Sequence, residues 1–197
     1  NKDGIYNACL HYGWIKERYL LALDMDGTLL KSDKTISPNT AASLIEANKK
    51  GQSICLCTGR GLAELKDYEG ELDFCDYGIL LSGCLIYDFK NDQPLEVHSF
   101  DTDVFTQVMD IVKKEDVMLY LLDSSHSIAS QKDVENMPYY NMAIYQSMFE
   151  SRAFIVEDIY EYAEVHKDEI LKFCLYKPSV DAMNQLLKKL EVFPVSC

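Results

Sequence analysis

Two aspartates in the run LLALDMDGTLL carry the side chains best suited to chemistry. Asp24 directly follows a continuous apolar run at residues 19–23, and Asp26 comes two residues later. Two carboxylates at i and i+2 can face one pocket where the backbone stays extended. Such a pair offers a nucleophile with an acid/base beside it, and it can help to hold Mg²⁺. Gly27 allows the chain to turn away, and Thr28 adds a hydroxyl.

A second polar loop, CTGR, follows the next apolar run, at residues 53–57. Thr58 supplies a hydroxyl, Gly59 a flexible backbone N–H and Arg60 a guanidinium, a combination that suits a phosphoryl oxygen. Either loop on its own is more often an ordinary turn. The two together, each at the end of a neighbouring strand, favour one phosphate site.

The elements around these loops predict a parallel sheet. Three short apolar runs indicate buried strands, at residues 19–23, 53–57 and 77–81. Helices are expected between Ser37, a suitable N-cap, and Gly51, and over residues 62–68. Alternating strands and helices favour parallel strands with right-handed crossovers. Ligands bind beyond the carboxyl ends of such strands, which is where both loops lie.

The pattern changes after about Asp88 and predicts a second α+β unit. A further short strand, at residues 85–87, still belongs to the first unit. In the second unit, strands are expected at residues 95–100, 117–122, 170–176 and 192–195, and helices over 103–114 and 179–190. Asp101 and Asp103 precede the first of these helices and are interpreted as capping residues. We therefore divide the chain into an extension (1–18) with no assigned role, the first part of an α/β core (19–88) and an α+β unit (89–197).

LLALDMDGTLL followed by SICLCTGR resembles motifs one and two of the haloacid dehalogenase-like superfamily. The layout is similar to its Cof-type phosphatases, in which an α/β cap domain is inserted after the third core strand. The resemblance covers residue 19 to the end of the chain. It implies an α/β fold with a Rossmannoid parallel-sheet core and an inserted α+β cap. It also implies a Mg²⁺-dependent phosphatase that hydrolyses small phosphorylated metabolites through an aspartyl-phosphate.

The resemblance also implies roles for individual residues. Asp24 would be the nucleophile and a magnesium ligand, and Asp26 the general acid/base, with its backbone carbonyl on the metal. Thr58 and the Gly59 amide would hold the transferring phosphoryl group, and Arg60 would lie near the substrate.

The chain departs from the family pattern in two places. Many Cof-type relatives carry Asn-Gly-Ala after the third core strand, where this chain has Ser82-Gly83-Cys84. Ser82 can still hydrogen-bond a substrate oxygen, with a shorter reach. The lysine and the second acidic metal loop of the family follow the cap, and the chain ends at Cys197 without them. We therefore expect part of a longer enzyme, with an incomplete core, weak magnesium binding and an apolar sheet edge.

The composition and charge of the chain disfavour several classes of binding partner. The formal net charge of −13 disfavours nucleic acid and anionic lipid as partners. No apolar run is long enough to cross a bilayer, and no secretory signal is recognisable. Seven scattered cysteines without zinc-ligand spacing indicate reduced thiols in a cytoplasmic protein. Nothing in the sequence indicates the oligomeric state.

Two other functions remain open. A phosphomutase would use the same Asp24 and Asp26, and a non-catalytic remnant would keep the fold without the chemistry. For a phosphatase, the candidate substrates are sugar phosphates, nucleotide or flavin precursors, and pyridoxal phosphate. Tyr139, Tyr140 and Tyr145 could form an aromatic wall for a substrate, although packing is the favoured interpretation.

Overall fold

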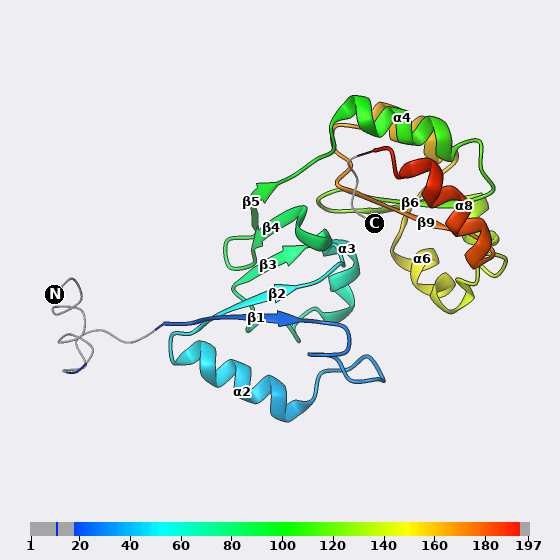
Figure 1. Ribbon diagram of the computed structural model, residues 1–197. Coiled ribbons are helices and arrows are strands. Elements are labelled where there is room, and N and C mark those ends of the chain that lie inside the picture. Colours follow the sequence, from blue (N-terminus) through cyan, green and yellow to red (C-terminus); the bar gives the residue numbers. More distant parts are fainter. Residues whose placement is uncertain (1–10, 12–17, 194–197) are drawn as a thin grey trace.

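The structure is a computed structural model that describes residue 11 and residues 18–193, built on two β-sheets (Figure 1). The first sheet contains β1 (Leu20–Asp24), β2 (Ser53–Cys57), β3 (Tyr77–Leu80), β4 (Leu85–Asp88) and β5 (Gln93–Val97), in that order. β1, β2 and β3 are parallel, whereas β4 and β5 continue the sheet antiparallel. The predicted parallel α/β core is therefore confirmed.

The crossovers of the first sheet are helical, as the sequence predicts. α2 (Pro38–Lys49) joins β1 to β2, and α3 (Leu62–Leu65) with η1 (Lys66–Tyr68) follows β2. Gly51 follows the α2 C-cap with a φ of +88°, a conformation that glycine adopts without strain. Ser37 occupies the N-cap position, but its side chain makes no capping hydrogen bond, contrary to the expectation.

The second sheet has the order β8-β7-β6-β9. Its strands are β6 (Met118–Leu122), β7 (Ser127–Ser130), β8 (Phe154–Val156) and β9 (Lys172–Tyr176). Its helices are α4 (Thr102–Val112), α5 (Gln131–Glu135), α6 (Gln146–Arg152), α7 (Ile159–Val165) and α8 (Val180–Leu190), with η3 (Ala143–Tyr145) before α6. The Asp101 carboxylate accepts from the backbone N–H groups of Asp103 and Val104, so its predicted capping role is confirmed.

One expected strand belongs to the other sheet. The sequence predicts a strand over 95–100 in the second unit, but β5 ends at Val97 and pairs with β4. The cause is the short turn at residues 89–92, which folds β5 back antiparallel onto β4. The expected strand at 192–195 is not formed at residues 192 and 193, and its remainder lies outside the described residues, as does nearly all of the extension 1–18.

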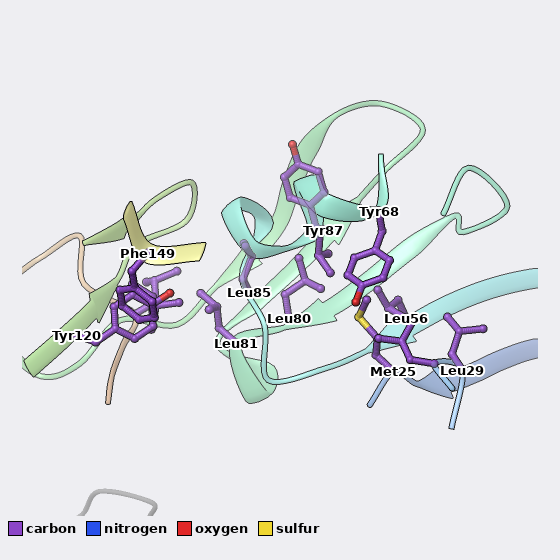
Figure 2. Packing of buried hydrophobic residues seen from close by; sticks show 14 of the residues in the cluster. Met25, Leu29, Leu56, Tyr68, Leu80, Leu81, Leu85, Tyr87, Tyr120 and Phe149 are labelled. Atoms are coloured by element: carbon purple, nitrogen blue, oxygen red, sulfur yellow. The ribbon is translucent and has the colours of Figure 1, made fainter. Parts of the chain in front are cut away.

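Two hydrophobic clusters meet at β6. Its alternate residues Leu119 and Leu121 face a cluster formed with α4, α7 and α8. Met118, Tyr120 and Leu122 face the other cluster, which continues into the first sheet. Figure 2 shows Tyr120 with Phe149 at one end of that cluster, and Met25, Leu29 and Leu56 at the other end. Apolar packing thus runs without interruption between the two units.

Helix lengths bear on membrane association. Among the described residues, no helix has both the length and the apolar character needed to cross a bilayer.

Candidate functional site

Asp24 is the last residue of β1, and the strand register sets its neighbours. Asp24 lies opposite Cys57 in the parallel pair β1–β2, so Thr58 follows at the same edge of the sheet. Asp24 and Asp26 are exposed, whereas Met25 between them is fully buried in the core. The expectation that the two carboxylates share one side of the backbone agrees with this alternation.

A tight turn follows β1 and directs the chain away from the sheet. The N–H of Leu29 donates to the Asp24 carbonyl at 3.2 Å, and the N–H of Leu30 donates to the Met25 carbonyl at 2.9 Å. Gly27 has a φ of +83° within this turn, a conformation that a side chain would strain. The sequence needs glycine here so that both aspartates stay at the strand end.

Two cations hold the Asp26 carboxylate. Arg60 donates to it from Nε and from a terminal nitrogen, both at 2.9 Å, and Lys34 Nζ donates at 2.8 Å. The two hydrogen bonds from Arg60, followed by the one from Lys34, lower the pKa of Asp26 to about 2, although partial burial opposes the shift. The Arg60 guanidinium also lies 5.5 Å from the centre of the Tyr68 ring. Asp26 is therefore ionised and fixed in this conformation.

The loop after β2 is held tightly at its first residue. The Thr58 N–H donates to the Ile79 carbonyl of β3 at 2.9 Å, and Thr58 is only 8% exposed. Its hydroxyl oxygen accepts from the Arg60 N–H at 3.2 Å. The predicted trio of Thr58, Gly59 and Arg60 thus forms one compact turn beside Asp26.

The loop after β3 reaches the same place. The Ser82 N–H donates to the Thr58 carbonyl at 3.2 Å, and the Leu81 N–H donates to the Arg60 carbonyl at 3.1 Å. Leu81 and Ser82 have φ values of 52° and 59°, and Gly83 has a φ of 104°. Consecutive left-handed residues other than glycine carry strain and concentrate at functional sites. The structure therefore brings Ser82 and Gly83 against the Thr58–Arg60 loop.

Sequence reasoning missed two lysines at this site. Lys34 binds Asp26 from the loop between β1 and α2. Lys172, the first residue of β9, donates from Nζ to the Gly59 carbonyl at 2.9 Å and to the Ser82 hydroxyl oxygen at 3.1 Å. A lysine within the apolar run ILKFCLY was the signal for Lys172, although its partner lies 113 residues away. Neither Lys188 nor Lys189 is among these site contacts, and Lys189 pairs with Glu115 instead.

The oxygen donors at the end of β1 suit a hard cation. Among the described residues, no group of three or more His, Cys, Asp or Glu side chains could hold a metal ion. Mg²⁺ commonly needs only one or two protein carboxylates and keeps several waters or substrate phosphate oxygens. The exposed Asp24 carboxylate, with the Asp26 carbonyl nearby in the chain, fits that requirement in part, since the Asp26 carboxylate is already bound by Arg60 and Lys34.

The remaining candidates have structural partners. Burial, followed by the neighbouring Cys57, raises the pKa of the Cys55 thiol to about 11, which disfavours a reactive thiolate. Tyr139 and Tyr140 donate from their hydroxyls to Asp116, and Tyr140 is buried whereas Tyr139 and Tyr145 are exposed. Histidines pair with nearby carboxylates at three described positions: His98 with Glu96, His126 with Asp123 and His166 with Glu169.

Comparison with known proteins identifies the family. The sequence profile of the haloacid dehalogenase-like hydrolases matches residues 21–195. The chain is 34% identical over 100 residues to the 5-amino-6-(5-phospho-D-ribitylamino)uracil phosphatase YitU of Bacillus subtilis (strain 168), covering 50% of this chain and 37% of that protein. It is 24% identical over 128 residues to the pyridoxal phosphate phosphatase YbhA of Escherichia coli (strain K12), covering 60% and 47%.

The fold matches solved structures as well. A haloacid dehalogenase-like hydrolase from B. subtilis superposes with a TM-score of 0.70 at 16% identity, covering 87% of this chain and 66% of that one. The chain spans about half the length, or less, of the curated relatives it matches. The Rossmannoid fold and the resemblance to the Cof-type phosphatases are thereby confirmed. This chain belongs to the haloacid dehalogenase-like hydrolase family.

Proposed function

We propose that this chain carries the nucleophile and phosphate loops of a Mg²⁺-dependent phosphatase that hydrolyses small phosphorylated metabolites through an aspartyl-phosphate. The observation that carries the proposal is the convergence of three loops at one edge of the first sheet. The exposed Asp24 ends β1 opposite Cys57, and the adjoining Thr58–Arg60 loop is bonded to Asp26 and Ser82. The names of the relatives YitU and YbhA support the reaction and the substrate class.

In this proposal, Asp24 attacks the phosphorus atom and takes the phosphoryl group, so that hydrolysis is divided into two easier steps. Asp26 gives a proton to the leaving oxygen and later takes one from the attacking water. The Thr58 hydroxyl and the Gly59 N–H bind phosphoryl oxygens, and Ser82 and Gly83 line the same loop. Asp24, with the Asp26 carbonyl, would hold Mg²⁺, which supplies charge neutralisation for the phosphate when bound.

The two cations that bind Asp26 are compatible with its proposed role as the general acid/base, because the substrate would compete for them. A phosphate monoester carries negative charge, and it competes with Asp26 for Arg60 and Lys34. Loss of the hydrogen bonds from either cation raises the pKa of Asp26 from about 2 toward that of an ordinary carboxyl. Substrate binding thus turns a fixed carboxylate into one able to carry a proton.

We also propose that this chain is the front of a longer enzyme, composed of a core part and an inserted cap. The length of the matched relatives supports this, and so does the open edge of β1, which pairs with β2 alone among the described strands. The division of the chain follows the sheets. We assign residues up to Val97 to the core and residues from Thr102 onward to the cap.

The experiment is phosphate release from a panel of phosphate monoesters by the enzyme that contains this chain. We expect Asp24→Asn to abolish turnover and Asp26→Asn to lower it by at least about 100-fold. Asp73→Asn is the matched control. Asp73 is exposed and lies before the amino end of β3, whereas the site lies at the carboxyl ends of the strands. Full turnover by Asp24→Asn would refute the proposal. A mutase would keep the phosphate on its substrate and release none.

A thermal shift with beryllofluoride, a phosphoryl mimic, tests the nucleophile without turnover. We expect the melting temperature of the wild-type protein to rise and that of Asp24→Asn to stay unchanged. The same response in both proteins would favour a non-catalytic remnant.

A further inference from the structure

Lys172 joins the second sheet to the loops of the site. It is the first residue of β9, where it lies opposite Leu122 of β6. Its Nζ donates to the Gly59 carbonyl at 2.9 Å and to the Ser82 hydroxyl oxygen at 3.1 Å. The cap thus supplies a cation that contacts both loops proposed to bind the phosphoryl group.

The contact completes a regular pattern on the Thr58–Arg60 loop. The three successive carbonyls of this loop each accept a hydrogen bond. Thr58 accepts from the Ser82 N–H and Arg60 from the Leu81 N–H, whereas Gly59 between them accepts from Lys172. Two of the three carbonyls are therefore fixed from within the first unit, and the middle one is fixed by the cap.

The lysine packs closely against residue 59, which has no side chain. A Cβ at Gly59 would lie 3.3 Å from Lys172 Nζ and 3.4 Å from the Ser82 hydroxyl oxygen, which is closer than such contacts usually are. Leu122 of β6 approaches Gly61 in the same loop region. A Cβ built at Gly61 would lie 3.5 Å from a methyl group of Leu122. The cap strands β6 and β9 thus meet the loop at Gly59 and Gly61.

We propose that Lys172 is a positioning residue for phosphoryl binding, which the cap brings to the Thr58–Arg60 and Ser82 loops. Its hydrogen bond orients the peptide between Gly59 and Arg60, and its contact with Ser82 holds a strained residue in place. An ammonium group has three donors, and these two contacts account for two of them. The charge lies 2.9 Å from the carbonyl of Gly59, the residue whose N–H is proposed to bind the phosphoryl oxygen, so it favours an anion at this loop. This inference rests on the proposed phosphate site but not on turnover.

The test is the affinity for inorganic phosphate of the enzyme that contains this chain, measured by titration calorimetry with Mg²⁺ present. We expect Lys172→Met to raise the Kd at least about 10-fold, since it removes a charge-assisted contact. Lys172→Arg keeps the charge and should bind within about 3-fold of wild type. Lys188→Met is the matched control, because Lys188 is an exposed lysine of α8 outside the site. It should bind as wild type does.

A second measurement separates positioning from a role in stability. Amide hydrogen exchange of residues 58–60 should become faster in Lys172→Met while exchange in β6 stays unchanged. Equal phosphate affinity of wild type and Lys172→Met would overturn the inference even if the enzyme turns over. An absence of phosphate binding by the wild-type enzyme would overturn it as well. A lower affinity in Lys172→Met would support it even if no turnover is found.

Discussion

β1 and β6 are both five-residue strands with apolar sequences, LLALD and MLYLL, yet their burial is opposite. Every residue of β6 is buried. No residue of β1 is buried, and Leu20 is 60% exposed. The two strands therefore contribute to the molecule in different ways.

The difference comes from their neighbours. β6 lies between β7 and β9, and a hydrophobic cluster covers each of its faces. β1 pairs with β2 alone among the described strands, and α2 beside it has no buried residue. Here the proposed nucleophile ends the weakly buried strand, and the well-packed unit supplies Lys172 to it.

Matched leucine truncations give the largest expected effect. We expect Leu121→Ala in β6 to lower the free energy of unfolding by about 2–5 kcal/mol, because Leu121 is fully buried and truncation leaves a cavity. Leu20→Ala in β1 should lower it by less than about 1 kcal/mol. Urea denaturation measures both. Equal losses would show that β1 is as well packed as β6 and would break the comparison.

Two buried aspartates, one in each unit, sharpen the comparison. Asp76 accepts from the Ile54 N–H at 2.8 Å and from Asn48 Nδ2 at 3.0 Å, and it pairs with Lys90. Burial raises the pKa of Asp76, but hydrogen bonds from Lys90, Ile54 and Asn48 outweigh it and lower the pKa overall. Asp133 in the second unit accepts from the Leu119 N–H at 3.4 Å, and burial raises its pKa.

Replacement by asparagine should therefore have opposite effects. Asp76→Asn removes the charge that Lys90 and the N–H donors stabilise, so we expect a loss of about 1–3 kcal/mol at pH 7. Asp133→Asn keeps an acceptor for Leu119 and removes a carboxylate that is costly to ionise, so we expect unchanged or higher stability at pH 7. Urea denaturation of the variants and of wild type measures both changes.

The pH dependence has opposite signs too. The pKa of Asp76 is lower in the folded state, so its contribution is present above about pH 4 and is lost as the pH falls. The pKa of Asp133 is higher in the folded state, so its ionisation reduces stability as the pH rises above about 4. The stability difference between wild type and each variant should follow these trends between pH 3 and pH 7. Parallel trends would contradict the assigned environments.

Much of this arrangement could be predicted from the sequence. Continuous apolar runs predicted β1, β2, β3 and β6, and Asp101 indicated the start of α4. β7 was missed because its sequence, SIAS, has a single bulky apolar residue and its burial comes from flanking strands. β8 has only three residues, too few for a period.

Only those residues of the site that directly follow an apolar run in the sequence were predicted. Asp24, Asp26 and the Thr58–Arg60 loop follow apolar runs, so their types and spacing were sufficient. Lys34 and Lys172 were not predicted, since their roles depend on contacts that the fold creates. Ser82 was expected near the site, but its left-handed backbone could not be read from a serine.

The smallest expected effect is a change in the pKa of Asp26 when one of its two cations, Arg60 or Lys34, is removed. Asp26 lies just beyond the exposed end of β1. Hydrogen bonds from Arg60 are the largest cause of the lowered pKa of Asp26, and the hydrogen bond from Lys34 contributes less. We therefore expect Arg60→Met to raise this pKa from about 2 to near the ordinary value, and Lys34→Met to raise it by a smaller amount. Carbon-detected NMR titration of the Asp26 carboxyl measures both shifts.

Asp33 provides an internal control within the same titration. Its pKa is also lowered to about 2, by hydrogen bonds from Lys31 and then Thr35, so neither substitution should change it. Because the folded-state pKa of Asp26 is depressed, its contribution to stability is present above about pH 4 and is lost as the pH falls toward 2. Arg60→Met should reduce that loss more than Lys34→Met does. A larger pKa rise in Lys34→Met than in Arg60→Met would contradict this order. It would mean that the flexible lysine fixes the carboxylate, rather than the guanidinium beside Tyr68. The exposed end of β1 would then be less ordered than the hydrogen bonds indicate.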